Sequence, residues 1–477
     1  MGLASGEYGA KRSIILLLEK ANNGATKTIS KLRELHTEYD ANRNTAATVV
    51  DGNVLVRSCP PLSYANFVDF LQKSLNSFFD VAKHVIVVFD EPDAVTVAKR
   101  EEQQHRDMAK KKREIQISHD LKHELPQSDD YNESDVKNCP NVQALIENRQ
   151  TRLRLLDIIF IKILTEAKTK KQHEIAIYGK AMSSLTLDGV DARGDSRSHN
   201  SARRPEILST EDLLPDILRR ETPIGEGDLK FTSIEKCIAK HQREDSPLCG
   251  VKIILLHTID TDALPIALIE EARRRSVIGE GNVKTVLCLR EPGRKRREDG
   301  SHTSPCFRVF DMAKFYSCVL FLMLGGTEHE HKLGREAVAL FAMTLCTAGC
   351  DFISKEQIRG LRANELLCTL GRVVREAPTI LPTMRYAWSG CVSDTQKLCG
   401  VLRHVLREHG KDMANGQHAV PEVLKSEHFS GSVSAVRRKN SPNIENPGEA
   451  ALLRAAWVVS YWHECEFKDL SKFGFLR

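Results

Sequence analysis

The sequence lacks a hydrophobic run long enough to cross a bilayer. A membrane-spanning helix needs about 20 apolar residues, and the longest apolar stretches here are residues 155–164 and 318–324. The opening residues, MGLASGEYGAKRS, also lack the apolar core of a secretion signal. We therefore expect an intracellular protein, nuclear or cytoplasmic, that is not secreted and has no membrane partner.

The CxxC spacing is absent as well. The chain has 13 cysteines, an odd number, and no CxxC motif. This pattern argues against a zinc ribbon and against a disulfide framework, and it favours a reducing compartment.

The net charge has little bias of either sign. The 69 Lys and Arg residues nearly balance the 64 Asp and Glu residues, which leaves a formal charge of +5. Basic residues nevertheless cluster at residues 110–113 and 294–297. A charge run is typical of a solvated face, so a nucleic-acid partner needs other support.

Apolar runs alternate with helical periodicity, which predicts an α/β protein with a mostly parallel sheet and helices on both faces. Residues 183–220 lack sustained periodicity and are interpreted as part of an insertion that spans 169–220. The predicted strands are 45–56, 84–89, 251–259, 285–290 and 308–310. Helices are predicted from Ser63, over 141–168, 312–324 and 334–348, and in a helical C-terminal region.

Three of the predicted strands lead into an acidic residue: Asp51, Asp90 and Asp260. Ligands of open parallel sheets bind beyond the carboxyl ends of the strands, so we expect these carboxylates to converge on one crevice. The alternative for any single position is that an Asp after a strand caps a turn or a helix. Three coincidences weaken that alternative.

Four further acids complete the pattern. Glu226 and Asp228 open a predicted helix, Asp262 follows Asp260 in a D-x-D, and Asp351 follows a buried helix. Seven carboxylates around one crevice would repel one another unless cations bind between them. Hard oxygen ligands favour Mg²⁺ or Mn²⁺, and two such ions can support hydrolysis of a phosphodiester.

A charged helix over residues 98–113 supplies the positive counterpart for a phosphate. Arg100 and Lys99 lie nearest the acidic crevice in sequence and are candidates for contacting the scissile phosphate. The remaining basic residues would follow the nucleic-acid backbone. Interleaved Glu101, Glu102 and Asp107 leave open the alternative of a solvated charged helix. The candidate nucleic-acid-binding residues are Lys99, Arg100, Arg106, Lys110, Lys111, Lys112 and Arg113.

The ordered set of motifs resembles the flap endonuclease family, which includes the xeroderma pigmentosum group G nucleases and, more distantly, the 5′→3′ exoribonucleases. The matches follow the family order over residues 45 to about 362. They are VVDGNV, IVVFDEPD, VAKR, PIGEGDLK, HTIDTDAL and TAGCDFISKEQIRGL.

This resemblance implies a PIN-like nuclease domain over residues 1–361, followed by a helical region of unknown role over 362–477. The domain would comprise an N-terminal part (45–113), a charged helical arch region with the insertion (114–220) and an internal acidic part (221–361). The implied activity is two-metal cleavage of DNA or RNA near a 5′ end or a single-strand junction, as in DNA repair. The implied catalytic and metal-binding acids are Asp51, Asp90, Glu226, Asp228, Asp260, Asp262 and Asp351, with Arg100 as a catalytic cation.

Two other functions compete with the nuclease. The first is a catalytically inactive relative that binds nucleic acid or acts as a scaffold. The complete acidic set argues against it, because such repulsion has no purpose without metal ions. The second is a phosphatase with Asp260 as its nucleophile, which is disfavoured because that D-x-D should follow the first strand of its fold.

Overall fold

The computed structural model contains two compact units. Lys27–Ile259 and Gly281–Phe307 form the first, here called the sheet unit. Asp260–Glu280 and Arg308–Arg477, with Met1–Thr26, form the second, the helical unit. The described residues are 29–57, 62–89, 132–139, 142–147, most of 152–166, 174–178, 207–209, 227–242, 246, 248–276, 283–290, 307–326, 330–347, 363–381, 392–415 and some of 452–459.

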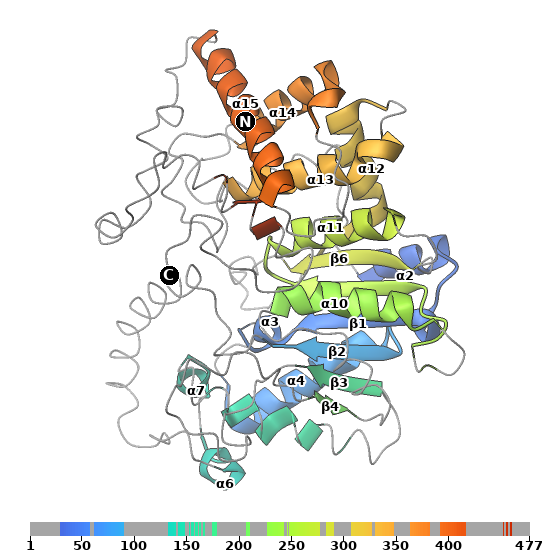
Figure 1. The fold of residues 1–477 in the computed structure, drawn as a ribbon. Helices are drawn as coiled ribbons and strands as arrows, with labels where there is room; N and C mark the ends of the chain where they lie inside the picture. The colour runs from blue at the N-terminus through green and yellow to red at the C-terminus, as the bar shows by residue number, and fades with distance from the viewer. Residues whose placement is uncertain are drawn as a thin grey trace. The chain divides into compact units, whose positions relative to one another are not determined.

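The sheet unit is built on a mostly parallel sheet in the order β4-β3-β2-β1-β5-β6 (Figure 1). Each neighbouring pair is parallel except β3 and β4, which are antiparallel. This confirms the predicted α/β class. The strands are β1 (Ala46–Asp51), β2 (His84–Val88), β3 (Glu174–Tyr178), β4 (Ile207–Ser209), β5 (Ile253–Thr258) and β6 (Lys284–Arg290).

The direction of winding reverses beside β1. The chain runs outward from β1 through β2 to β3, and later returns to the other side of β1 with β5 and β6. Val50 of β1 pairs with Val87 of β2 and with His257 of β5. The carboxyl ends of these three strands are therefore adjacent, and the reversal lies between β1 and β5. Such a switch point is where open α/β sheets bind ligands.

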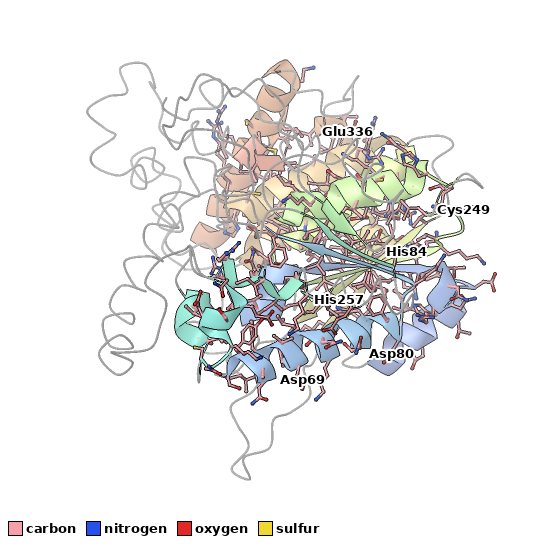
Figure 2. All side chains as sticks on the ribbon, turned by 90° about the horizontal axis from the view of Figure 1, so that it is seen from below. Asp69, Asp80, His84, Cys249, His257 and Glu336 are labelled. Carbon is pink, nitrogen blue, oxygen red and sulfur yellow. The ribbon has the colours of Figure 1, made fainter. Side chains whose placement is uncertain are left out.

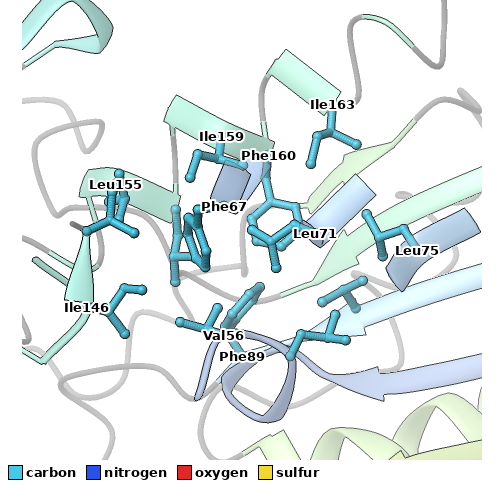
Figure 3. Close-up of a cluster of buried hydrophobic side chains, with 14 of the residues drawn as sticks. Val56, Phe67, Leu71, Leu75, Phe89, Ile146, Leu155, Ile159, Phe160 and Ile163 are labelled. Atoms are coloured by element: carbon cyan, nitrogen blue, oxygen red, sulfur yellow. The ribbon is translucent and has the colours of Figure 1, made fainter. Parts of the chain in front are cut away.

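Helix α4 (Tyr64–Phe79) covers one face of the sheet. It begins after Ser63, as predicted, and its buried stripe includes Phe67, Leu71 and Leu75 at helical spacing. These side chains pack with Phe89 and with helical residues from 142–163 in one apolar cluster (Figure 3). Burial of each such side chain contributes roughly 1.5–3 kcal/mol, so this cluster anchors α4 to the strands.

Helix α10 (Gly227–Lys240) covers the opposite face (Figures 1 and 2). Glu235 of this helix accepts a hydrogen bond from the Thr285 hydroxyl at 2.7 Å. Thr285 of β6 pairs with Ile254 of β5, and Ile254 pairs with Ala47 of β1. These three side chains therefore lie in one row across the sheet, on the same face. Side chains alternate along a strand, so this row faces away from Val50, which belongs to the cluster under α4.

The described helical unit consists mainly of α11 and four further long helices. Helix α12 begins where the carboxylate of Asp311 accepts from the amides of Ala313 and Lys314, and it ends at Gly325 in the left-handed conformation (φ 71°). Among the helices of the described part, none is both long and apolar enough to span a bilayer. The elements are β7 (Phe307–Asp311), α11 (Ala263–Ser276), α12 (Met312–Leu324), α13 (Glu330–Thr347), α14 (Ala363–Glu376) and α15 (Val392–Asn415).

Several short elements complete the described chain. They are α2 (Ile29–Glu38), a 3-10 turn at Arg43–Thr45, α3 (Gly52–Arg57), α6 (Glu133–Val136), α7 (Gln143–Glu147) and a 3-10 turn at Pro378–Ile380.

Two predictions of local structure were wrong. The strand predicted over 45–56 ends at Asp51, and helix α3 follows at once, because the Asp51 carboxylate accepts from the amides of Asn53 and Val54. The segment 183–220, in which no element was predicted, contains β4, and β3 lies just before it within the proposed insertion 169–220. Their hydrogen bonds to β2 and to each other extend the sheet.

Candidate active site at the carboxyl end of the sheet

Asp51 is the last residue of β1, at the end of the strand that borders the switch point. Its Oδ1 accepts hydrogen bonds from the amides of Asn53 at 2.9 Å and Val54 at 3.4 Å. Asp51 thus caps the short helix α3 and is half-buried. Since Val50 points into the cluster under α4, alternation places the Asp51 side chain on the face that α10 covers. The cap fixes this carboxylate at the mouth of the sheet.

Gly52 and Phe89 hold the ends of β1 and β2 together. Phe89 follows β2 directly, is 1% exposed, and its ring lies so close to Gly52 that a Cβ there would overlap it. The same ring packs against Phe160 with centroids 5.5 Å apart. Only glycine leaves room for this approach. The contact fixes the backbone that follows Asp51 relative to the backbone that precedes Asp90.

Lys230 ties the first turns of α10 to the same strand end. Its Nζ donates to the Phe89 carbonyl oxygen at 2.6 Å, and the residue is fully buried. Helix α10 begins at Gly227, and Asp228 is its second residue. The start of the helix is therefore positioned against the carboxyl end of β2, within the sheet unit.

Asp260 and Asp262 belong to the helical unit and follow β5 closely in the chain. The Asp262 amide donates to Oδ1 of Asp260 at 2.9 Å. This turn leads into α11, which starts at Ala263. Asp262 is 4% exposed. Asp260, like Asp51, therefore uses one carboxylate oxygen to shape the turn that leaves its strand.

His257 lies near the same end of β5 but serves the core on the α4 side. Its ring packs against Phe78 with centroids 4.8 Å apart. Burial disfavours the charged imidazolium and lowers the pKa of His257 to about 3. This neutral histidine shares a cross-strand row with Val50, so it lies on the face opposite the Asp51 carboxylate.

The structure brings together only part of the predicted site. Within the sheet unit it places Asp51 and the start of α10 at the carboxyl end of the central strands. Asp260 and Asp262 are also described, in the turn that follows β5. Among the described residues, no group of three or more His, Cys, Asp or Glu residues could hold a metal ion. Outside the described residues lie Asp90, Glu226, Asp351, Lys99, Arg100, Arg106, Lys110, Lys111, Lys112 and Arg113, together with the Asp228 side chain.

The chemistry of the donor set fits a hard cation. Asp51 and Asp260 present carboxylate oxygens at turns that follow adjacent parallel strands, and the nearby imidazole of His257 lies on the other face of the sheet. Oxygen-only sets favour Mg²⁺ or Mn²⁺ over zinc.

Sequence reasoning missed three residues that organise this end of the sheet: Gly52, Phe89 and Lys230. Each is adjacent or nearly adjacent to a predicted acid, in the segments DG, FD and DLK. A glycine directly after a strand-ending Asp indicates a close approach. A lysine between Leu229 and Phe231, both apolar, indicates a buried cation in the first turn of a helix.

No protein-family model matches this chain, and no curated protein matches it at a significant level. The resemblance to the flap endonucleases therefore rests on the motifs themselves.

Proposed function

We propose that this protein is a divalent-metal-dependent nuclease that resembles the flap endonucleases and 5′→3′ exonucleases. The observation that carries the proposal is topological. The winding of the sheet reverses between β1 and β5, and β1 ends in Asp51 while β5 leads into Asp260. A switch point lined by carboxylates suits a cation-dependent reaction on an anionic substrate.

The arrangement of α10 supports the same proposal. The Lys230 hydrogen bond to Phe89 places the N-terminal end of α10 beside the end of β2, and the sequence puts Asp228 in that first turn and Asp90 directly after Phe89. Carboxylates at a helix N-terminus are favoured by the helix dipole. These contacts, with the pairing of β1 and β2, support the proposed convergence of the three acidic segments of the sheet unit.

The proposed chemistry divides roles among the residues. The seven acids Asp51, Asp90, Glu226, Asp228, Asp260, Asp262 and Asp351 would hold two Mg²⁺ or Mn²⁺ ions. Bound ions of this kind lower the pKa of a water and offset charge on a leaving oxygen. Arg100, with Lys99, would neutralise the phosphate. The basic residues from Arg106 to Arg113 would bind the nucleic-acid backbone and orient the substrate.

The caps provide a sharp test of the proposal. Asp51→Asn and Asp260→Asn each keep a side-chain carbonyl oxygen that can accept the observed amide hydrogen bond, but each removes a negative charge. Incubation with 5′-flap DNA and with single-stranded RNA in Mg²⁺ should give cleavage by the wild-type chain and none with EDTA. Both variants should be folded and should cleave at least about 100-fold more slowly.

Asp69→Asn is the matched control. Asp69 lies exposed on α4, paired with Lys73 at 2.7 Å, and it is remote in sequence from every predicted ligand. Its variant should cleave at the wild-type rate. Absence of cleavage by the wild-type chain, or undiminished cleavage by both Asp51→Asn and Asp260→Asn, would contradict the proposal. Nucleic-acid binding that is insensitive to EDTA, without cleavage, would instead support the inactive binding relative.

A further inference from the structure

The burial of Lys230 on α10 is energetically unfavourable unless its ammonium group is paired. Lys230 has no exposed surface, although an ammonium group loses several kcal/mol of hydration on burial. Lysines are almost never fully buried unless they are paired. Its Nζ lies 2.6 Å from the Phe89 carbonyl oxygen, a short charge-assisted hydrogen bond. A simple anchor between a helix and a sheet could be built from apolar side chains alone.

The hydrogen bond joins two segments that carry predicted acids. Lys230 comes two residues after Asp228, and Phe89 comes one residue before Asp90. On its other side, the Phe89 ring is packed on Gly52, which directly follows Asp51. Phe89 is thus the common contact of three backbone segments, and Lys230 fixes its carbonyl.

We infer that Lys230 is a positioning residue for metal binding, which holds the end of β2 and the start of α10 in the arrangement that the acids require. This inference rests on the proposed nuclease function. Lys230 is proposed to act through the Phe89 carbonyl oxygen, to which its Nζ donates. Residues that orient metal ligands typically change affinity or activity by 10- to 100-fold when they are replaced.

Lys230→Met tests whether the Lys230 hydrogen bond positions the metal ligands. Methionine nearly matches the length of the lysine stem and removes both the donor and the charge. Because the substitution leaves the Phe89 carbonyl oxygen without its donor, the melting temperature should fall, and metal binding and cleavage are therefore compared well below the melting temperature of the variant. Lys230→Arg keeps a charged donor. Lys240→Met is the matched control, because Lys240 is exposed in the last turn of the same helix, about 15 Å along the axis.

Three measurements test the inference on the full chain: Mn²⁺ binding by titration calorimetry, cleavage of 5′-flap DNA against Mg²⁺ concentration, and thermal unfolding. For Lys230→Met we expect Mn²⁺ affinity and kcat to fall by about tenfold or more. The Mg²⁺ midpoint should rise, while KM for the nucleic acid stays at the wild-type value and the variant remains folded at the assay temperature. Lys230→Arg should recover part of the Mn²⁺ affinity, and Lys240→Met should behave as wild type.

The failures of the two proposals are distinguishable. If the wild-type chain binds no Mn²⁺ and cleaves neither DNA nor RNA, the nuclease proposal fails and the inference fails with it. If the wild-type chain binds and cleaves but Lys230→Met matches it, only the inference fails. A fall in activity explained entirely by a lower melting temperature, or a gain in Mn²⁺ affinity, would also overturn positioning.

Discussion

The ring of Phe89 lies directly over the backbone of Gly52, with no room for a side chain between them. Gly52 follows Asp51, and Phe89 precedes Asp90. One close contact therefore sets the spacing between the ends of two neighbouring parallel strands, each of which leads into a predicted metal ligand. The glycine matters here for proximity, since the ring occupies the position that a Cβ would take.

Gly52→Ala should destabilise the sheet unit. The added methyl group overlaps the Phe89 ring, and Phe89 is held by Phe160 and by the cluster under α4. Overfilling of a packed core costs about 1–3 kcal/mol. We expect a lower melting temperature and faster hydrogen exchange in β1 and β2.

Gly400→Ala is the control for this substitution. Gly400 lies within α15, and nothing is within 4 Å of the position where its Cβ would be. Alanine in a helix interior is favoured over glycine by about 0.5–1 kcal/mol, so this variant should be neutral or slightly more stable. Equal stability of Gly52→Ala and the wild-type chain would contradict the close packing at Phe89.

The cap at Asp51 predicts different stabilities for two substitutions. Asp51→Ala removes the acceptor for the Asn53 and Val54 amides, and a lost cap costs about 0.5–2 kcal/mol. Asp51→Asn retains an acceptor and should unfold close to the wild-type temperature. Thermal unfolding of both variants checks the difference; identical melting temperatures would show that the cap contributes nothing to stability.

His257 predicts a loss of stability in acid. Burial holds its pKa at about 3 in the folded chain, against about 6.5 in an unfolded one. Below pH 6.5 the unfolded state binds the extra proton, so the stabilising difference falls as pH drops from 6.5 toward 3. The slope attributable to this group is at most about 1.4 kcal/mol per pH unit.

Denaturant unfolding of the wild-type chain and His257→Leu between pH 7 and pH 4.5 measures this effect. The variant lacks the titrating group, so its stability should fall less steeply than that of the wild-type chain. Parallel curves for His257→Leu and the wild-type chain would refute the assignment.

Kinetics should distinguish the predicted role of Arg100 at the scissile phosphate from that of Lys110 on the nucleic-acid backbone. Arg100→Ala should lower kcat by about 100-fold or more, because a cation at the reacting phosphate acts in the transition state. Lys110→Ala should mainly raise KM and reduce the salt dependence of binding by about one unit of slope. Steady-state cleavage at several salt concentrations distinguishes them; indistinguishable effects of the two substitutions would count against the role of Arg100.

Most of the sheet could be predicted because buried parallel strands are continuous apolar runs. HVIVVF, VKIILLHTI and TVLCLR each correspond to a strand of the structure. The apolar residues after Asp51 were wrongly predicted to continue the strand. Val54, Leu55 and Val56 are buried, as strand residues would be, but they lie on helix α3. The hydrogen bonds of the Asp51 carboxylate start a helix there, and the apolar character of the residues does not reveal these bonds.

The elements that were missed carry weaker local signals. Strands β3 and β4 are short and lie within a long polar background, so their pairing depends on β2 rather than on their own pattern. The predicted positions of two acids could be checked: Asp51 ends β1, and Asp228 lies in the first turn of α10. Gly52, Phe89 and Lys230 could not be assigned in advance, since their roles depend on contacts between segments far apart in the chain.

The metal site can be tested by calorimetric titration of Mn²⁺ into the metal-free wild-type chain and into Asp51→Asn. We expect the wild-type chain to bind two ions and the variant, still folded, to bind Mn²⁺ about tenfold or more weakly. Absence of Mn²⁺ binding by the wild-type chain, or the same affinity in both, would contradict a metal site at the carboxyl end of this sheet.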